Sequence, residues 1–301
     1  MMRSQQQTRK RRAPLDLGAI LIAPLGLGLV VVAQRLAGVP ADTLVQSSAA
    51  LIVFGGTLGA LLITYSLRDV LRTARAAAGT FRRAEADLDT LAATLVTLAS
   101  RAHRHGLVAI DADAEAVEDA FMREGLAFAI DDTSTNTLRE ILSAESQARA
   151  SAEESPARVL EAAAGYAPTL GILGAVLGLI HVMRGLGGQV SLGSGIAVAF
   201  VATVYGVGTA NLILLPLAGR LRERAALAAQ RRELMTVAIC AIQQRSHPRV
   251  LARKLRAFGV NADKDLQRLR TSTTSVDVAH GALSLSLGTV GAASRDSQAL
   301  A

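Results

Sequence analysis

Hydroxyl and proline residues interrupt two otherwise apolar stretches of the sequence, and these residue types could handle an ion. Pro168 and Thr169 lie near the start of one stretch, and Thr203 and Pro216 lie in another. A proline frees a helix carbonyl, which can coordinate an ion or a water where protein surrounds it. Hydroxyl oxygens can replace part of an ion's hydration shell. The chemistry that these residues favour is ion passage.

No lysine, arginine, aspartate or glutamate accompanies these polar groups. Four long stretches lack all four residue types: Leu17–Ala33, Leu44–Leu67, Ala162–Met183 and Leu192–Gly219. A protein that moves cations usually needs an ionisable residue at membrane depth. If ions pass here, we therefore expect the group that binds them to come from a partner helix.

Each of these four stretches is close to or above the ~20 residues that a helix needs to cross a bilayer. Half of the residues are hydrophobic and only 19% are charged, whereas about a quarter of the residues of a typical soluble domain are charged. The sequence predicts an all-α, polytopic membrane protein with four transmembrane helices and a helical cytoplasmic insert. A cleaved signal is the alternative for the first stretch, but its apolar core exceeds the usual ~7–15 residues.

Basic residues set the expected topology, because cytoplasmic loops are enriched in lysine and arginine. The run "RKRR" precedes the first span, and arginines follow the second and fourth spans. We therefore expect the protein in the inner membrane of the cell, with both termini and the long insert in the cytoplasm. The predicted order is a basic arm (1–14), transmembrane helices 1 and 2 (15–67), a cytoplasmic helical domain (68–161), transmembrane helices 3 and 4 (162–219), cytoplasmic C-terminal helices (220–260) and a disordered tail (261–301).

The polar segments are expected to be helical. We expect the basic residues to interact with membrane lipids and not with nucleic acid. The predicted helices are Arg68–Arg104, ended by Gly106, then Asp113–Ala129, Thr135–Ala150, Glu223–Arg245 and Leu251–Phe258, ended by Gly259. Arg68, Arg72 and Arg75 stay near the anionic leaflet that attracts them. No aromatic residues interleave with the "RKRR" charges, as a surface for stacking bases would require.

Small residues recur at helical spacing on three of the four spans. In lipid, helices associate through close backbone approach, which glycine permits. The expected packing residues are Gly55, Gly59, Gly171, Gly174, Gly178, Gly195 and Gly206. Their repetition favours contacts between chains, and the alternative is that they only hold one chain's helices together.

Catalysis is not expected. The sequence shows no nucleophile–base set, no phosphate-binding GK[ST] loop, no metal-binding histidine pattern and one cysteine, Cys240. Two other classes of membrane protein are alternatives. A transporter with its own substrate site would need an intramembrane charge, which is missing here. The second alternative is a purely structural membrane scaffold.

Four runs together resemble one family of membrane proteins. They are "LIVFGGTLGALLITYSL" (51–67), "GYAPTLGILGAVLGLI" (165–180), "GSGIAVAFVATVYGVGTANLILLPLAGRL" (193–221) and "AIQQRSHPRVLARKL" (241–255). They resemble the MotA-type stator subunit of the bacterial flagellar motor, within the MotA/TolQ/ExbB proton-channel group. The resemblance extends from about Leu15 to Phe258. It implies no cofactor beyond the transported H⁺ or Na⁺.

The resemblance implies partners and roles for particular residues. It implies a pentamer around single-span B-type subunits, each with a transmembrane aspartate and a peptidoglycan-binding domain. Pro168 and Pro216 fall on prolines that couple ion flow to motion, and Thr203 falls near the ion-carrying aspartate. Ala175 stands where the sodium-driven branch has threonine, which favours protons, although Thr203 and backbone carbonyls could also serve sodium.

The resemblance also implies contact with the rotor protein FliG through the 68–161 segment. The family's charged pattern aligns on Arg101, His103, Arg104 and Asp111, with histidine at the arginine position and aspartate at the glutamate position. A solvated basic turn is the alternative. A related rotary motor driving a non-flagellar process, or an ExbB/TolQ-like energy-transducing channel, are the alternatives within the group.

Overall fold

The computed structural model describes residues 45–80, 88–185 and 192–260, with the isolated positions 28, 32 and 36. Every regular element in these ranges is a helix, so the predicted all-α class is confirmed. The chain divides into two compact units, one from residues 1–85 and 148–228 and the other from residues 86–147 and 229–301. The predicted first span, Leu17–Ala33, lies almost wholly outside the described residues, as do the 1–14 arm and the 261–301 tail.

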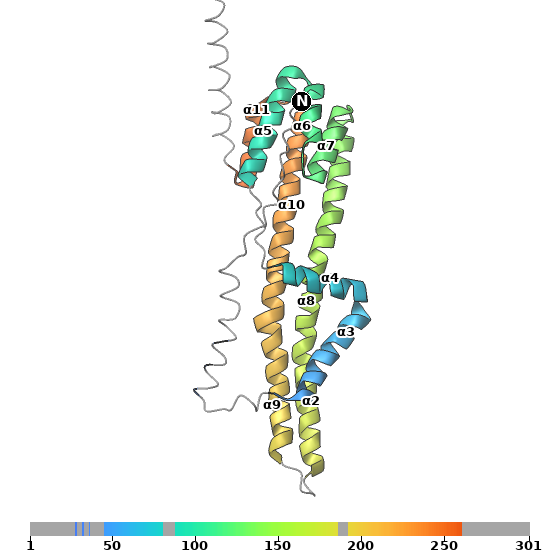
Figure 1. Cartoon of the computed structure of the whole chain (residues 1–301), viewed down its shortest axis with the longest axis vertical. Coiled ribbons are helices and arrows are strands. Elements are labelled where there is room, and N and C mark those ends of the chain that lie inside the picture. The colour runs from blue at the N-terminus through green and yellow to red at the C-terminus, as the bar shows by residue number, and fades with distance from the viewer. Residues whose placement is uncertain are drawn as a thin grey trace, which may run out of the picture. The chain divides into compact units, whose positions relative to one another are not determined.

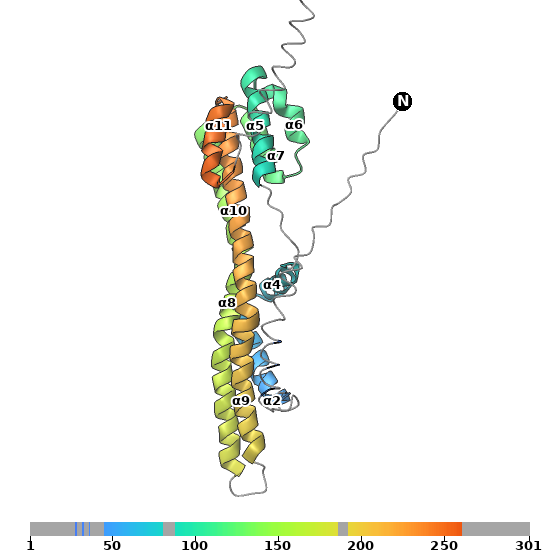
Figure 2. The same cartoon turned by 90° about the vertical axis from the view of Figure 1, so that its left-hand side faces the viewer.

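Three of the described helices are long and apolar enough to cross a membrane: Ser47–Thr64, part of Thr135–Arg184 and part of Gly195–Gln243. The first comprises α2 (Ser47–Ala50), the π-helical turn η2 (Leu51–Gly55) and α3 (Gly56–Thr64). The second is α8 (Thr135–Gly185). The third comprises α9 (Leu192–Thr209), the π-helical turn η4 (Ala210–Leu214) and α10 (Leu215–Gln243). In the first unit, α8 and α9 lie side by side in both views (Figure 1, Figure 2).

Two of the predicted helix ends are absent. We expected Thr135–Ala150 to be separate from the third span, but α8 passes through both, with Pro156 and Pro168 inside it. We also expected a break after the fourth span, but α10 begins within that span and continues to Gln243. Alanine, glutamate, leucine and arginine fill both junctions, and these are strong helix formers. Their propensity, together with packing, outweighs the prolines, each of which costs about 3 kcal/mol inside a helix.

The predicted single helix Arg68–Arg104, which we expected to continue from the second span, is wrong, because the chain leaves the span at Tyr65 and one helix ends at Gly79 before another begins at Leu88. Tyr65 is extended, with φ −126° and ψ 152°, and a new helix α4 (Leu67–Gly79) follows. The Ser66 side chain accepts a hydrogen bond from the Asp69 backbone N–H at 3.2 Å and donates to the Asp69 carboxylate at 2.7 Å. This cap satisfies groups that the helix start leaves unpaired. In consequence α4 lies crosswise to its neighbours α8 and α10 (Figure 1) and is seen nearly end-on in Figure 2.

The second unit is a small helical bundle with its own core. Its elements are α5 (Leu88–His105), η3 (Leu107–Ile110), α6 (Asp111–Glu115), α7 (Ala120–Ile130), α11 (Pro248–Leu255) and η5 (Arg256–Phe258), with parts of α8 and α10. Gly106 ends α5 with φ 87°, and Gly259 ends η5 with φ 77°, as predicted. The predicted single helix Asp113–Ala129 is wrong, because the Asp119 side chain caps a separate α7 by accepting from Met122 N–H at 3.2 Å.

The core of this second unit contains the chain's one cysteine. Cys240 is 2% exposed and packs with the large buried side chains Phe121, Met122, Leu126, Leu138, Leu234, Ile239 and Leu251. Burial raises the pKa of the Cys240 thiol. Both effects slow its reactions, because the thiolate is the nucleophile and must be reached by the reagent.

We therefore expect Cys240 in the folded protein to react with iodoacetamide more slowly than an exposed cysteine, by roughly tenfold or more. The matched control is Ser143→Cys in a Cys240→Ala background, since Ser143 is exposed on α8. Raising the pH through the ordinary range of thiol pKa values should increase the alkylation rate of the control cysteine more than that of Cys240 in the folded protein. Equal alkylation rates, followed by mass spectrometry, would contradict the buried position.

Candidate ion pathway and helix-packing seam

Glycines let the backbones of α8 and α9 touch along a seam. A Cβ atom placed on Gly206 would lie 2.5 Å from the Ala167 carbonyl oxygen, and one on Gly171 would lie 2.8 Å from the Ala202 carbonyl oxygen. A Cβ on Gly178 would lie 2.9 Å from the Gly195 carbonyl oxygen. Real Cβ atoms essentially never come this close to another heavy atom. No other residue fits at these positions without moving one helix from the other.

The glycine seam joins two helices of the same chain. The small-residue stripes of α8 and α9 meet each other there, as in the alternative that they hold one chain's helices together, and contacts between chains stay a prediction. On the second span, Gly55 and Gly59 meet no other described helix, so their packing role stays a prediction. The close contact falls on Gly56 instead, where a Cβ would lie 3.1 Å from Leu170 Cδ2.

Two of the expected ion-pathway residues border this seam. Pro168 Cα would lie 3.1 Å from a Cβ on Gly206, and Thr203 Cα would lie 3.4 Å from a Cβ on Gly171. Both residues are half-buried. The Thr203 hydroxyl donates to the Ala199 carbonyl at 3.2 Å, which leaves its oxygen lone pairs for an ion or a water.

The other three expected pathway residues lie on the same helices with different surroundings. Thr169 is exposed and its hydroxyl donates to the Tyr166 carbonyl at 2.8 Å. Ala175 is half-buried and brings no oxygen atom in its side chain. Pro216 is exposed on α10. In the described chain the five residues therefore do not enclose a binding site.

A π-helical turn ends two residues before Pro216, and the sequence did not predict it. Proline has no N–H to donate four residues back, so the regular ladder is interrupted near Leu212. The turn η4 (Ala210–Leu214) takes up this irregularity. Such single π-turns occur often at functional sites. The sequence did carry a signal for such an irregular turn, namely polar Thr209 and Asn211 followed by Pro216 within an apolar span.

A cavity of about 230 Å³ lies beside this turn, within the first unit. Its lining is mostly apolar and comes from η2, α3, α4, α8, the end of α9 and η4. The Thr73 hydroxyl is buried at its edge and has no hydrogen-bond partner among the described residues. By contrast, the Thr57 hydroxyl, which also lines the cavity, donates to the Val53 carbonyl at 2.6 Å.

His181 is a titratable residue in the third span, although that span contains no lysine, arginine, aspartate or glutamate. It is exposed and lines a second cavity of about 290 Å³ together with Gln46, Ser48 and Gly178. It lies three residues before Arg184, close to the end of α8, and not in the middle of the apolar stretch.

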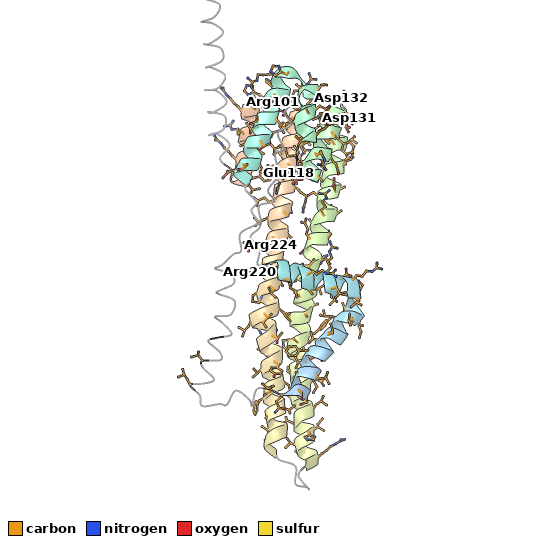
Figure 3. The ribbon with its side chains drawn as sticks, viewed as in Figure 1. Arg101, Glu118, Asp131, Asp132, Arg220 and Arg224 are labelled. Carbon is orange, nitrogen blue, oxygen red and sulfur yellow. The ribbon has the colours of Figure 1, made fainter. Side chains whose placement is uncertain are left out.

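Charged residues resume on α8 and α10 where α4 crosses them. The Arg222 guanidinium lies 2.7 Å from the Glu161 carboxylate and 4.0 Å from that of Glu154. Arg224 donates to the carbonyl oxygens of Gly79 at 2.9 Å and Thr80 at 2.7 Å (Figure 3). These carbonyls end α4, where a cation interacts favourably with the helix dipole. Arg224 therefore fastens the end of α4 to α10.

The residues expected to meet a rotor are exposed and also engaged within the second unit. Arg101 pairs with the Asp113 carboxylate, a partner that the sequence did not predict. His103 Nδ1 donates to the Arg245 carbonyl at 2.8 Å, and its ring lies edge-on to His247 with centroids 5.2 Å apart. Arg104 donates to the Ser100 hydroxyl at 2.9 Å. Asp111 begins α6 and is exposed.

Solved structures share this fold. The flagellar MotAB stator complex from Bacillus subtilis matches with a TM-score of 0.72 and 30% identity, over 84% of this chain and 98% of that one. The MotAB structure from C. jejuni matches with a TM-score of 0.75 and 24% identity, over 81% of this chain and 96% of that one. Fold and seam together define a polytopic helical membrane protein of the stator-channel class.

Sequence comparison then places the chain in a family. The model of the MotA/TolQ/ExbB proton channel family matches residues 113–234. Motility protein A of Bacillus subtilis (strain 168) is 31% identical over 241 residues, which are 79% of this chain and 87% of that protein. The chain belongs to the MotA/TolQ/ExbB proton channel family.

The seam makes a prediction from two glycines on one helix. Gly206→Ala should lower the thermal unfolding temperature, because overpacking of this kind costs about 1–3 kcal/mol. Gly208→Ala is the matched control, since a Cβ there meets nothing within 4 Å. It should be neutral or stabilising, by up to about 1 kcal/mol of helix propensity. Equal thermal shifts of the two variants in the same detergent would argue against the close approach.

Proposed function

We propose that this chain is the A-type subunit of a bacterial flagellar stator, which converts ion flow into torque together with a B-type subunit. One observation carries the proposal. The described spans bring Pro168 and the Thr203 hydroxyl to the α8–α9 seam, but the apolar stretches contain no lysine, arginine, aspartate or glutamate. A cation crossing at that depth needs a titratable or charged group, so the pathway is incomplete without another chain.

The relatives support the same role and the same kind of partner. The Bacillus subtilis structure is a stator complex of MotA with MotB, and the sequence relative is a motility protein. By likeness, the partner of this chain is a single-span B-type subunit that supplies an aspartate to the pathway and binds peptidoglycan. The protein is placed in the inner membrane with both termini in the cytoplasm, following the lysine and arginine bias.

Protons fit this pathway better than sodium. Sodium must exchange its hydration shell for several oxygen ligands. Ala175 contributes no side-chain oxygen, so among the expected pathway residues that border the seam only Thr203 offers a hydroxyl oxygen as a ligand. A proton needs only a titratable carboxylate and a chain of hydrogen bonds, which a partner aspartate beside Thr203 would provide.

A ring of five A-type subunits is part of the proposal, but it rests on other surfaces than the glycine seam. The faces of α8 and α9 away from the seam expose large apolar side chains, among them Ile172, Val176, Phe200, Val204 and Val207. Neighbouring subunits and B-type helices can cover these faces by close packing in lipid. Native mass spectrometry in mild detergent measures the number of chains directly.

Ion conduction by the isolated chain is the sharpest test of the partner requirement. Proteoliposomes that contain this chain alone should show no proton flux above that of empty vesicles, because no carboxylate lies in the described spans. Adding the B-type subunit should produce flux, and replacing its transmembrane aspartate by asparagine should abolish it. Clear flux from the A-type chain alone would refute the proposal.

The rotor contact can be tested by separating intrachain pairing from exposed charge. Arg101→Glu alone would face Asp113, so the double variant R101E/D113R is used to keep an ion pair while reversing the exposed sign. Charged rims set on-rate and orientation more than affinity. We therefore expect this pair swap, and Arg104→Glu, to reduce swimming speed at unchanged protein abundance.

The control for the rotor experiment is Arg139→Glu, which reverses another exposed arginine of the same unit outside the α5–α6 turn. It should leave motility near that of the unmodified protein. If the pair swap and Arg104→Glu both support full motility, the turn is a solvated surface and the rotor contact lies elsewhere.

A further inference from the structure

Helix α4 lies where the apolar spans give way to charged residues. The apolar span α2–α3 stops at Thr64, and α4 starts three residues later. At the same level α8 and α10 change from apolar to charged, with Glu161 paired to Arg222. Arg224 holds the far end of α4 at this level through the Gly79 and Thr80 carbonyls. A helix fixed crosswise to the spans at this level has the orientation of an interfacial helix (Figure 1).

One face of α4 packs against its own unit. Val70 packs with the cluster around Leu61, Val159 and Ala163. Ala76 and Ala77 pack with a neighbouring cluster from α8 and α10. This face fixes the rotation of α4 about its axis, so the direction of the remaining faces follows.

Two further stripes of α4 are exposed, and of their residues only Ala74 borders the cavity shared with α3 and α8. Residues three and four apart share a helix face. The first stripe is apolar and exposed, with Leu67 61% and Leu71 47% exposed, and it continues through Ala74 and Ala78. The second stripe is basic and exposed, and it consists of Arg68, Arg72 and Arg75. No ion pair joins these three guanidinium groups to another described residue.

The order of the faces matches the layers of a membrane surface. With about 3.6 residues per turn, successive residues are ~100° apart, so the apolar stripe lies about a quarter turn from the arginines on one side and about a quarter turn from the packed Val70 and Ala77 on the other. A helix with leucines beside arginines lies in the interface, with its leucines in the acyl boundary and its cations among the headgroups. Arginine forks match the geometry of phosphate oxygens.

We propose that α4 is a binding surface for anionic phospholipid headgroups, with Arg68, Arg72 and Arg75 on the phosphates and Leu67 and Leu71 in the acyl boundary. The arginines are complementary in charge to anionic headgroups, and the exposed leucines suit the acyl boundary, so lipid is the ligand that fits both stripes. An acidic soluble protein would pair with the arginines but would leave Leu67 and Leu71 in water. Because Arg224 ties α4 to α10, bound lipid also holds α4 in place against the helix that carries η4 and Pro216. This inference is independent of the stator role.

Lipid retention by the purified full chain tests the proposal. The protein in a neutral maltoside detergent is titrated with phosphatidylglycerol or phosphatidylcholine, and native mass spectrometry counts the bound lipids per chain. We expect preferential retention of phosphatidylglycerol, and we expect R68Q/R72Q/R75Q to weaken it by roughly tenfold or more, since each basic residue near an anionic surface adds attraction. The control R249Q/R253Q/K254Q removes the same charge from exposed positions on α11 and should retain the lipid.

A second measurement keeps the outcome clear if a triple variant folds poorly. Leu71→Cys in the Cys240→Ala background carries a fluorophore, and the chain is reconstituted with brominated lipid at a low mole fraction. Brominated phosphatidylglycerol should quench the probe more strongly than brominated phosphatidylcholine, and high salt should remove the difference. Equal quenching by both lipids, or equal retention by R68Q/R72Q/R75Q and the unmodified chain, would overturn the proposal.

Discussion

The contact between the α8 and α9 backbones is the constraint on which the first unit depends. Lipid tails are as apolar as leucine, so no hydrophobic drive holds these helices together, and close packing must replace it. Gly171, Gly178 and Gly206 allow that packing because any Cβ there would overlap a backbone atom of the facing helix. The seam in turn sets the positions of Pro168 and Thr203, which border it. The polar groups of the pathway are therefore placed by glycine packing and not by a polar network of their own.

At the end of the spans, packing in lipid gives way to charge and hydrogen bonding. Arg222 joins α10 to α8 through Glu161, and Arg224 joins α10 to the end of α4. The Arg222–Glu161 pair is partly exposed, so it contributes modestly by itself, and the hydrogen bonds of Arg224 to the end of α4 add to it. In the second unit an ordinary core takes over, with Phe121, Leu234 and Ile239 fully buried. Helices α8 and α10 contribute residues to both units, so the two kinds of stabilisation meet along continuous helices.

Much of this could be predicted from the sequence, because apolar length and glycine spacing are strong signals. The helical class, the α8–α9 packing residues and the stops at Gly106 and Gly259 follow from local rules. Features that depend on competition between signals could not be predicted. The break expected between Ala150 and the third span is absent, because helix-forming neighbours keep α8 continuous through Pro156. By contrast, Tyr65 interrupts a run that looked helical throughout, and Ser66 caps the next helix. The Arg101–Asp113 pair joins α5 to α6 across a turn, and nothing in the spacing of its residues indicates it.

The central claim is that α8 pairs with α9–α10 of the same chain, and a cross-link across that pair tests it most directly. Arg222→Lys places an amine opposite Glu161, and a carbodiimide then joins the two without a spacer. Protein is prepared from cells that express isotopically light and heavy chains together, so that each oligomer contains both. We expect the peptide pair 161–222 to be light–light or heavy–heavy only. Light–heavy pairs at about the frequency of random mixing would show that the helices pair between chains and would contradict the account.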